Sequence, residues 1–280
     1  MRSNRGVDLQ LSRGPLHALC SGPDGGSPAL CVPGLSANAR SFDRIADALA
    51  EAGRRVVVFD LRGRGLSPAD APGTHGWRRH AEDVLEAATR LGFESFDLAG
   101  HSMGAFVSMQ IAALEPRRVR RLVLIDGAGP PEPAALPPIL AAVQRLDQVY
   151  PSAEEYCARI ERHGTAQPWR ELWKAHYLYE LEPAPEGGVR PRTSKAAVLE
   201  DAVYGSKQDA KAFWPALTMP TLLVRASRPL LPGTGFVVGE KLRDDFLDAV
   251  PSARAVEVDA NHYGVMAHPE ALRAITRFLT

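Results

Sequence analysis

The chain has 280 residues, which is long enough for one large domain with a substantial insertion or for two modest domains. Its 33 basic and 33 acidic residues cancel, so no overall field attracts nucleic acid or an anionic membrane. No apolar run is long enough to span a membrane, and residues 1–10 lack the apolar core of a signal peptide. We therefore expect a soluble cytoplasmic protein with a small-molecule substrate, no nucleic-acid partner and no membrane contact; the oligomeric state is unknown.

Cysteine and histidine spacing argues against disulfides and metal centres. Cys20, Cys31 and Cys157 are scattered, with neither a paired framework nor metal-site spacing, which is typical of a reducing compartment. We also predict no metal, since no two of five further histidines form a pair at metal-ligand spacing with a carboxylate partner. These histidines are His75, His80, His163, His176 and His268.

Strands and helices alternate through the first sixty residues. Two loosely alternating runs around the turn at residues 13–15 predict a hairpin at a sheet edge. A short apolar strand leads into a loop that begins with Pro33 and Gly34, and apolar residues at helical spacing follow until Gly53. The predicted elements are the hairpin Val7–Leu11 and Leu16–Cys20, strand Ala29–Val32, helix Phe42–Ala50 and strand Arg55–Phe59.

A glycine-punctuated turn with two arginines, Asp60–Ser67, follows the second apolar strand. It lacks the lysine and the hydroxyl residue of a phosphate-binding loop, and no helix follows at once. We interpret it as a tight connection whose arginines pair with nearby carboxylates. Trp77–Leu91 then reads as an amphipathic helix that Gly92 ends.

The stretch Leu98–Gly104, which reads Leu-Ala-Gly-His-Ser-Met-Gly, predicts a strand, a sharp turn and a helix. Ser102 lies in the turn between two glycines, which let strand and helix approach each other closely. A bare Gly-x-Ser-x-Gly pattern is common, so its strand and helix context carries the inference. We expect Ser102 to be a nucleophile. His101 is expected to serve packing, with its side chain turned away from the serine hydroxyl.

The strongly β-branched run Val119–Ile125 predicts another buried strand, which Asp126 follows directly. Buried strands that alternate with helices indicate an α/β protein with a mostly parallel sheet covered on both faces. Ligands of such sheets collect at the carboxyl ends of the strands. Asp60, Ser102 and Asp126 all lie at or just past such ends, so we expect them along one rim.

Between Gly129 and Pro215 the pattern changes to many prolines, helical segments and no convincing buried strand. We predict a helical lid at 129–215, inserted into a core of 1–128 and 216–280. Trp169, Trp173, His176 and Tyr177 share one helix face, for which packing onto the core is the commoner role. Trp173 and Tyr177 are the candidates for substrate contact. The helices expected here are Leu136–Val149, Ala153–His163, Trp169–Leu181 and Lys195–Val203.

After the insertion the buried-strand pattern resumes. Strand Pro220–Ala226, helix Val237–Val250 and strand Ala255–Val258 precede a final helix from Pro269 to the end. The loop between the last strand and the last helix carries His262, which we therefore expect on the same rim as Ser102.

The element order, the serine turn, the Asp60–Ser67 turn and the late histidine together resemble the α/β-hydrolase superfamily. That resemblance implies that Ser102 attacks a carbonyl, that His262 moves its proton, and that an acid orients the histidine. It also implies an oxyanion hole made by the backbone N–H groups of Leu35 and Met103, with no cofactor. Pro33 stands where many relatives have histidine, which affects the shape of the loop more than its chemistry.

The position of the acid departs from most relatives, which carry it in the loop after the penultimate strand. Here that loop, residues 227–233, contains no carboxylate. We expect Asp126 to replace it, because some lidded relatives place the acid there, among them acetamidomethylenesuccinate-type hydrolases and cofactor-free quinolone dioxygenases. Asp259, or no acid at all, is the alternative.

The sequence thus predicts a serine hydrolase that cleaves a small ester, amide or related carbonyl compound through an acyl-enzyme. A C–C bond hydrolase of a keto-acid would use the same residues and need a basic contact, for which Arg145, Arg159 and Arg64 are candidates. A cofactor-independent oxygenase would keep the histidine and acid, and a non-catalytic binding protein would keep only the fold.

Overall fold

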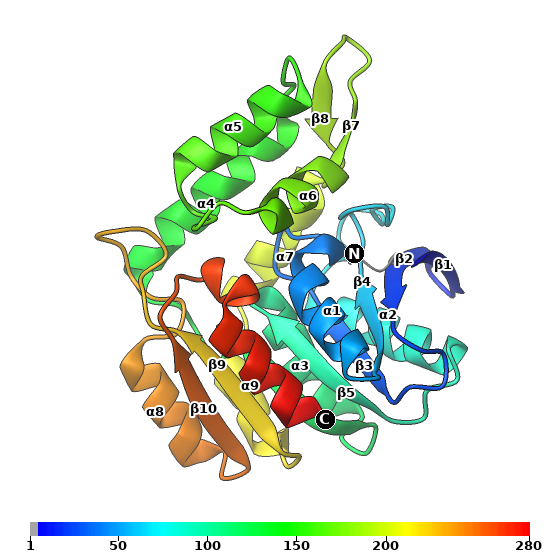
Figure 1. Ribbon diagram of the computed structural model, residues 1–280, viewed down its shortest axis with the longest axis vertical. Coiled ribbons are helices and arrows are strands. Elements are labelled where there is room, and N and C mark those ends of the chain that lie inside the picture. The colour runs from blue at the N-terminus through cyan, green and yellow to red at the C-terminus, as the bar shows by residue number, and fades with distance from the viewer. Residues whose placement is uncertain (1–4) are drawn as a thin grey trace.

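The computed structural model describes residues 5–280, which form a central eight-stranded sheet in the order β1-β2-β4-β3-β5-β6-β9-β10 (Figure 1). β1 and β2 form an antiparallel hairpin at one edge, β2 pairs antiparallel with β4, and the remaining pairs are parallel. The strands are β1 (Arg5–Leu11), β2 (Gly14–Ser21), β3 (Pro28–Val32), β4 (Arg55–Phe59), β5 (Phe96–His101), β6 (Val119–Ile125), β9 (Thr221–Ala226) and β10 (Ala253–Val258).

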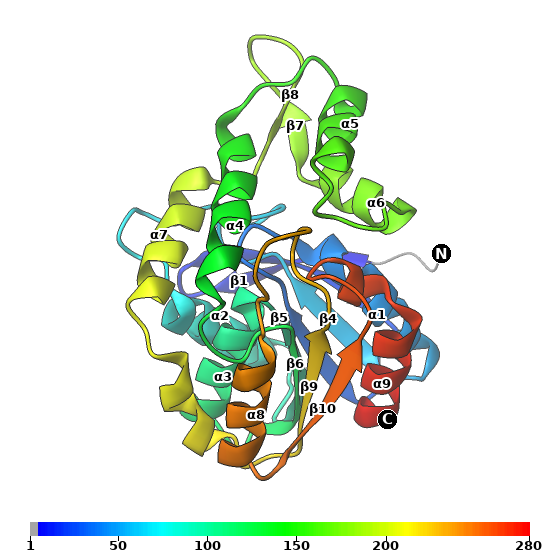
Figure 2. The ribbon, with the colours of Figure 1, turned by 90° about the vertical axis from the view of Figure 1, so that its left-hand side faces the viewer.

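Helices cover both faces of the sheet, as Figure 2 shows. On one face lie α1 (Asp43–Glu51) and α9 (Pro269–Leu279), and on the other lie α2 (Trp77–Arg90), α3 (Met103–Leu114) and α8 (Glu240–Ala249). This architecture confirms the predicted α/β class and its mostly parallel sheet. Within residues 5–280, no helix has the length and apolar character needed to cross a membrane.

The sheet forms because its inner strands are apolar on both faces, as expected for parallel strands covered by two helical layers. Every residue of β5 is buried, and Leu98 at its centre is fully enclosed. The carboxyl ends of the parallel strands meet at one edge. The loops after β3, β5, β6 and β10 therefore bring Leu35, Ser102, Asp126 and His262 to the same rim.

Most of the segment between β6 and β9, called here the inserted segment (129–215), lies over this rim in both views, and its last part runs down beside α3 (Figures 1 and 2). It contains η2 (Pro133–Ala135), α4 (Leu136–Val143), η3 (Gln144–Asp147), α5 (Ala153–His163), α6 (Glu171–Tyr179), α7 (Lys195–Ser206) and η4 (Ala210–Ala216), besides the two short strands β7 (Leu181–Pro183) and β8 (Val189–Pro191).

One expectation for the inserted segment is wrong in detail, and the structure adds one short hairpin to it. The helix predicted over 136–149 ends at Val143, where a 3₁₀ turn begins. The hairpin of β7 and β8 was not expected, because strands of three residues that stay partly exposed carry too little periodicity to be recognised. Elsewhere, predicted and observed boundaries differ by a few residues, as at α8, which begins at Glu240.

Replacing Leu98 by alanine should lower the free energy of unfolding by about 3 kcal/mol, because the lost side chain leaves a cavity between the sheet and the helical layer of α2 and α3. Urea unfolding measures the change. Leu66→Ala is the matched control, since Leu66 is 45% exposed and its loss should cost less than about 0.5 kcal/mol. Equal effects of the two changes would contradict this assignment of the core.

Candidate active site

Ser102 stands in a strained turn between β5 and α3. Its φ of 56° and ψ of −122° lie outside the regions that residues with a side chain prefer. The turn is possible because Gly100 and Gly104 lack a Cβ: an added Cβ would overlap the carbonyl oxygen of Gly104 in the first case and of Val32 in the second. The N–H of Ser102 donates to the carbonyl of Ile125 at 3.0 Å, which ties the turn to β6.

His262 and Asp126 are joined by a hydrogen bond. The Nδ1–H of His262 donates to Oδ2 of Asp126 at 2.7 Å, and both side chains are buried. The second oxygen, Oδ1, accepts the N–H of Ala226 at 3.1 Å, so both carboxylate oxygens are held. With a proton on Nδ1, the neutral imidazole keeps its lone pair on Nε2.

The alternative acid, Asp259, pairs at the surface with Arg228, and its side chain is 70% exposed. Asp126 instead follows β6 directly, with a φ of 45°, a conformation that aspartate tolerates better than most residues. The structure therefore brings His262 together with Asp126, as expected from their strand ends.

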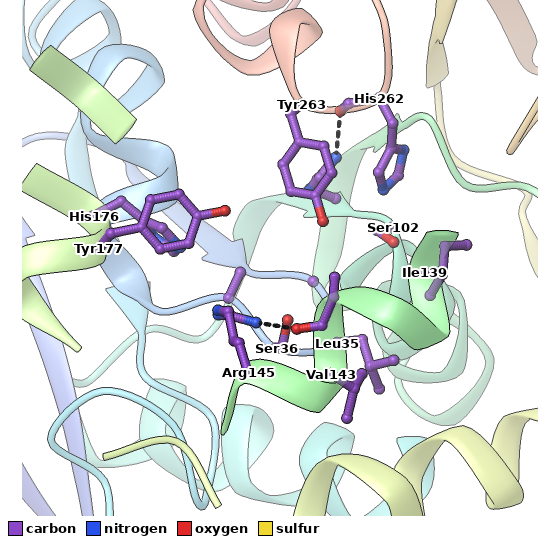
Figure 3. A pocket seen from close by; sticks show the side chains of 14 residues that line it. Leu35, Ser36, Ser102, Ile139, Val143, Arg145, His176, Tyr177, His262 and Tyr263 are labelled. Carbon is purple, nitrogen blue, oxygen red and sulfur yellow. Dashed lines mark hydrogen bonds between the residues drawn. The ribbon is translucent and has the colours of Figure 1, made fainter. Parts of the chain in front are cut away.

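A small cavity lies over Ser102 between the sheet rim and the inserted segment. Figure 3 shows the imidazole of His262 directed toward Ser102, and the hydroxyls of Tyr177 and Tyr263 directed into the same space. Its lining residues come from the loop after β3, the serine turn, α4, η3, α6 and the His262 loop. They are Gly34, Leu35, Ser36, Ala37, His101, Ser102, Ile139, Ala142, Val143, Arg145, His176, Tyr177, His262 and Tyr263.

The backbone N–H groups of Leu35 and Met103 have no hydrogen-bond partner among the described residues. Met103 is the first residue of α3, and a first-turn N–H has no partner within its helix. The carbonyl of Gly34 accepts the N–H of Ala37 at 3.2 Å. Because the C=O and N–H of one trans peptide point in opposite directions, this turn directs the Leu35 N–H away from Ala37.

His101 has a larger part in the site than packing alone. It lines the cavity, its ring lies 4.5 Å from that of His262, and its Nε2–H donates to the backbone carbonyl of His262 at 3.0 Å. Burial, with His262 beside it, holds the pKa of His101 well below its usual value, so the ring is neutral. The sequence does not predict this hydrogen bond, because it joins residues 161 positions apart.

The inserted segment supplies an aromatic and basic wall. Tyr177 lines the cavity as expected. Trp173 does not line the cavity and packs edge-on against two lining residues, His176 and Tyr263. Trp173 thus supports the wall from behind instead of contacting the cavity. Burial, with Arg145 and Arg40 nearby, lowers the pKa of His176 to about 3, so this histidine is also neutral.

The three arginines considered as carboxylate contacts are all engaged. Arg145 lines the cavity, but its Nη2 donates to both oxygens of buried Glu180 at 3.0 and 3.1 Å. Arg64 is buried beside Asp201, at 2.6 Å, and does not line the cavity. Arg159 is hydrogen-bonded to Gln148 at the surface. The charge of Arg145 is thus balanced within the wall itself.

The expectation that no histidine pair meets a carboxylate is wrong for His75 and His80. Their side chains and that of Asp201 offer ligand atoms within 4.8 Å of one another, brought together by the packing of α7 on α2. The guanidinium of Arg64 already lies against Asp201, at 2.6 Å, and His80 Nε2 lies 2.9 Å from the same oxygen. A metal cation there would be repelled by the arginine, so the donor set favours a salt bridge over a metal centre.

The arginines of the Asp60–Ser67 turn pair with carboxylates as predicted. Arg62 donates to Asp83 of α2 at 2.8 Å, in addition to the Arg64 pair. Asp60, which we expected on the rim, is buried and accepts from the N–H of Ala39 and the hydroxyl of Tyr179 of α6. Asp60 therefore joins the core to the inserted segment and does not line the cavity.

Comparison with known proteins supports the same family. The sequence model described as alpha/beta hydrolase fold matches residues 28–269. The chain is 34% identical over 238 residues to "Putative carbamate hydrolase RutD" of Variovorax paradoxus, covering 84% of this chain and 85% of that protein. It is 30% identical over 252 residues to 2-(acetamidomethylene)succinate hydrolase of Mesorhizobium japonicum, covering 88% and 85%. The crystal structure of an E-2-(acetamidomethylene)succinate hydrolase superposes with a TM-score of 0.87, at 26% identity over 99% of both chains.

Replacing Gly104 by alanine should lower the free energy of unfolding by about 3 kcal/mol, because the new methyl group meets the rigid backbone of β3. Urea unfolding measures the change. The control is Gly25→Ala, since a Cβ at Gly25 meets nothing within 4 Å. A Gly104→Ala variant as stable as the control would refute the close packing described here.

His176 should make the protein less stable in acid. Its pKa is about 3 when folded and near 6.5 when unfolded, so between these values the unfolded chain binds the extra proton. The free energy of unfolding then falls as pH falls, by up to about 1.4 kcal/mol per pH unit for this group. Urea unfolding of wild type and His176→Gln from pH 7 to pH 4 should show wild type losing stability relative to the variant; a constant difference would contradict a neutral His176.

Proposed function

This chain belongs to the α/β hydrolase fold family, and on that premise we propose that it is a serine hydrolase with the triad Ser102, His262 and Asp126. The observation that carries the proposal is the 2.7 Å hydrogen bond from His262 to Asp126, in a cavity that also exposes Ser102. That bond leaves Nε2 of His262 free to accept a proton on the side where Ser102 lies.

In the proposed reaction, Nε2 of His262 takes the proton of the Ser102 hydroxyl as the serine oxygen attacks the substrate carbonyl. The tetrahedral intermediate collapses when His262 gives that proton to the leaving alcohol or amine, which leaves an acyl-serine. Water repeats the sequence and releases the acid. General-base assistance of this kind contributes ~10²–10⁴-fold to the rate.

The N–H groups of Leu35 and Met103 would bind the oxyanion that forms in each step. Both are unbonded, and both belong to backbone already held in place, by the Gly34–Ala37 turn and by helix α3. Donors that need no rearrangement stabilise developing charge best, and the loss of one such donor costs ~3 kcal/mol in the transition state.

For the substrate we propose a small ester, amide or carbamate. Two relatives are named for carbamate and acetamido substrates, which share a carbonyl bonded to nitrogen. The hydroxyls of Tyr177 and Tyr263 offer hydrogen bonds to a polar group. Because Glu180 balances Arg145, the described lining holds no uncompensated cation for the carboxylate of the keto-acid that a C–C bond hydrolase cleaves.

A panel of p-nitrophenyl esters, aryl amides and carbamates, assayed with wild type and Ser102→Ala, tests the proposal. Wild type should turn over at least one class, and the variant should lose at least about 10³-fold in kcat. A fluorophosphonate probe should label wild type at Ser102 and leave the variant unlabelled. Lack of turnover together with an unlabelled Ser102 would favour a binding protein, and activity that survives Ser102→Ala would favour the oxygenase.

The identity of the acid has its own test. Asp126→Asn should lower kcat by about 10⁴-fold, because the asparagine no longer holds His262 in the tautomer that leaves Nε2 unprotonated. Asp259→Asn should keep kcat within about twofold, since Asp259 pairs with Arg228 at the surface, away from His262. Kinetics on the best panel substrate measure both, and full activity in Asp126→Asn with loss in Asp259→Asn would overturn the triad.

A further inference from the structure

A buried ion pair connects the inserted segment to the core next to the loop after β3. Asp201 of α7 lies 2.6 Å from Nη2 of Arg64, and neither side chain is exposed. His80 of α2 places Nε2 2.9 Å from the same carboxylate oxygen. Nothing in the proposed reaction uses these three residues, and none of them lines the cavity.

Arg64 also donates hydrogen bonds to the loop after β3 and to the loop after β4. Its Nε and Nη2 both donate to the carbonyl of Leu35, at 3.0 and 2.8 Å, and its Nη1 donates to the carbonyl of Arg62 at 2.8 Å. Two donors in a fixed plane hold an acceptor in direction as well as in distance. The guanidinium therefore fixes the orientation of the Leu35 carbonyl.

The direction of the Leu35 N–H is fixed by hydrogen bonds of two consecutive peptide groups. Its own peptide is oriented by the hydrogen bond from Ala37 N–H to the Gly34 carbonyl, and the next peptide is oriented by Arg64. The Leu35 side chain packs against Val143, Leu146 and Val198, which all belong to the inserted segment. Backbone and side chain of Leu35 thus both depend on contacts that reach the insertion.

The carboxylate of Asp201 balances the buried positive charge of Arg64. Burial lowers the pKa of Arg64, and Asp201 offsets part of that shift, so the guanidinium is charged. Burial would raise the pKa of Asp201, but His80 and Arg64 lower it to about 2, so the carboxylate is ionised. Removing only the negative charge would leave a buried, unpaired guanidinium, which is costly and favours displacement of Arg64 toward water.

We propose that Asp201 is a positioning residue: through Arg64 it holds the Leu35 carbonyl, and so couples helix α7 of the inserted segment to the oxyanion-binding N–H of Leu35. The inference rests on the proposed serine-hydrolase function. It makes the inserted segment responsible for transition-state binding as well as for the roof of the cavity.

The kinetic test compares Asp201→Asn with wild type on the best ester of the panel. We expect kcat to fall about 10- to 100-fold with KM within about threefold, because a misdirected Leu35 N–H weakens only transition-state binding. Affinity for a trifluoromethyl ketone inhibitor, whose adduct carries an oxyanion, should fall in parallel. Asp201→Glu, which keeps the charge, should recover part of kcat.

The matched control is Asp97→Asn. Asp97 is equally buried and pairs with Arg54, but it lies near the start of β5, at the end of the strand remote from Ser102. Its loss should lower the free energy of unfolding while kcat stays within about twofold. If Asp97→Asn lowers kcat as much as Asp201→Asn does, the effect is general destabilisation and the proposal is wrong.

Arg64→Lys provides a second variant should Asp201→Asn fail to fold. Lysine keeps a cation for Asp201 but has no planar fork for the Leu35 carbonyl, so kcat should again fall with little change in KM. Wild-type kcat in either folded variant would overturn the proposal.

A readout independent of activity separates this inference from the proposed function. The carbonyl ¹³C resonance of Leu35 should shift in Asp201→Asn and in Arg64→Lys, and should stay unchanged in Asp97→Asn. An unchanged resonance in the first two variants refutes the coupling even if the protein is a hydrolase. If Ser102 is unlabelled and no substrate turns over, the proposed hydrolase function is refuted. The Leu35 resonance still tests whether Asp201 is coupled to Leu35 through Arg64.

Discussion

The whole site depends on the absence of a side chain at Gly100 and Gly104. At these glycines, helix α3 packs against strands β3 and β5 so closely that a Cβ would overlap backbone atoms. That contact allows Ser102 its positive φ and leaves the Met103 N–H at the open end of α3. The parallel sheet supplies the rest, because adjacent strand ends bring Asp126 and the His262 loop to the same rim. A strained turn persists only where the surrounding packing holds it.

Around this turn, each buried charged group has a specific hydrogen-bonding or ion-pair partner. Asp126 is bonded to His262, Arg145 to Glu180, and Arg64 to Asp201. A charge buried without a partner would cost several kcal/mol, so each pair also fixes the elements that carry it. Two of these pairs involve the inserted segment, which is therefore part of the electrostatic structure of the site and more than a cover over it.

Much of this arrangement could be predicted because its signals are local. Each of these signals can be read from a short stretch of sequence: the Gly-x-Ser-x-Gly turn, the β-branched strands, and residues 227–233, which contain no carboxylate. Together with the rule that parallel strand ends share a rim, they led to the pairing of Asp126 with His262 that the structure contains. The catalytic use of that pair, and of the Leu35 and Met103 N–H groups, stays a prediction.

Periodicity and glycine spacing act over a few residues, so they are enough to predict the α/β class, the order of the strands along the chain and the sharp serine turn. The folded chain adds that His101 holds the His262 loop, that Trp173 stands behind the cavity wall, and that Asp201 reaches Arg64. These contacts join residues more than a hundred positions apart or depend on which helix face turns inward. The residue pattern along the chain does not determine which distant residues meet or which helix face turns inward. Packing of the inserted segment against the sheet rim determines it.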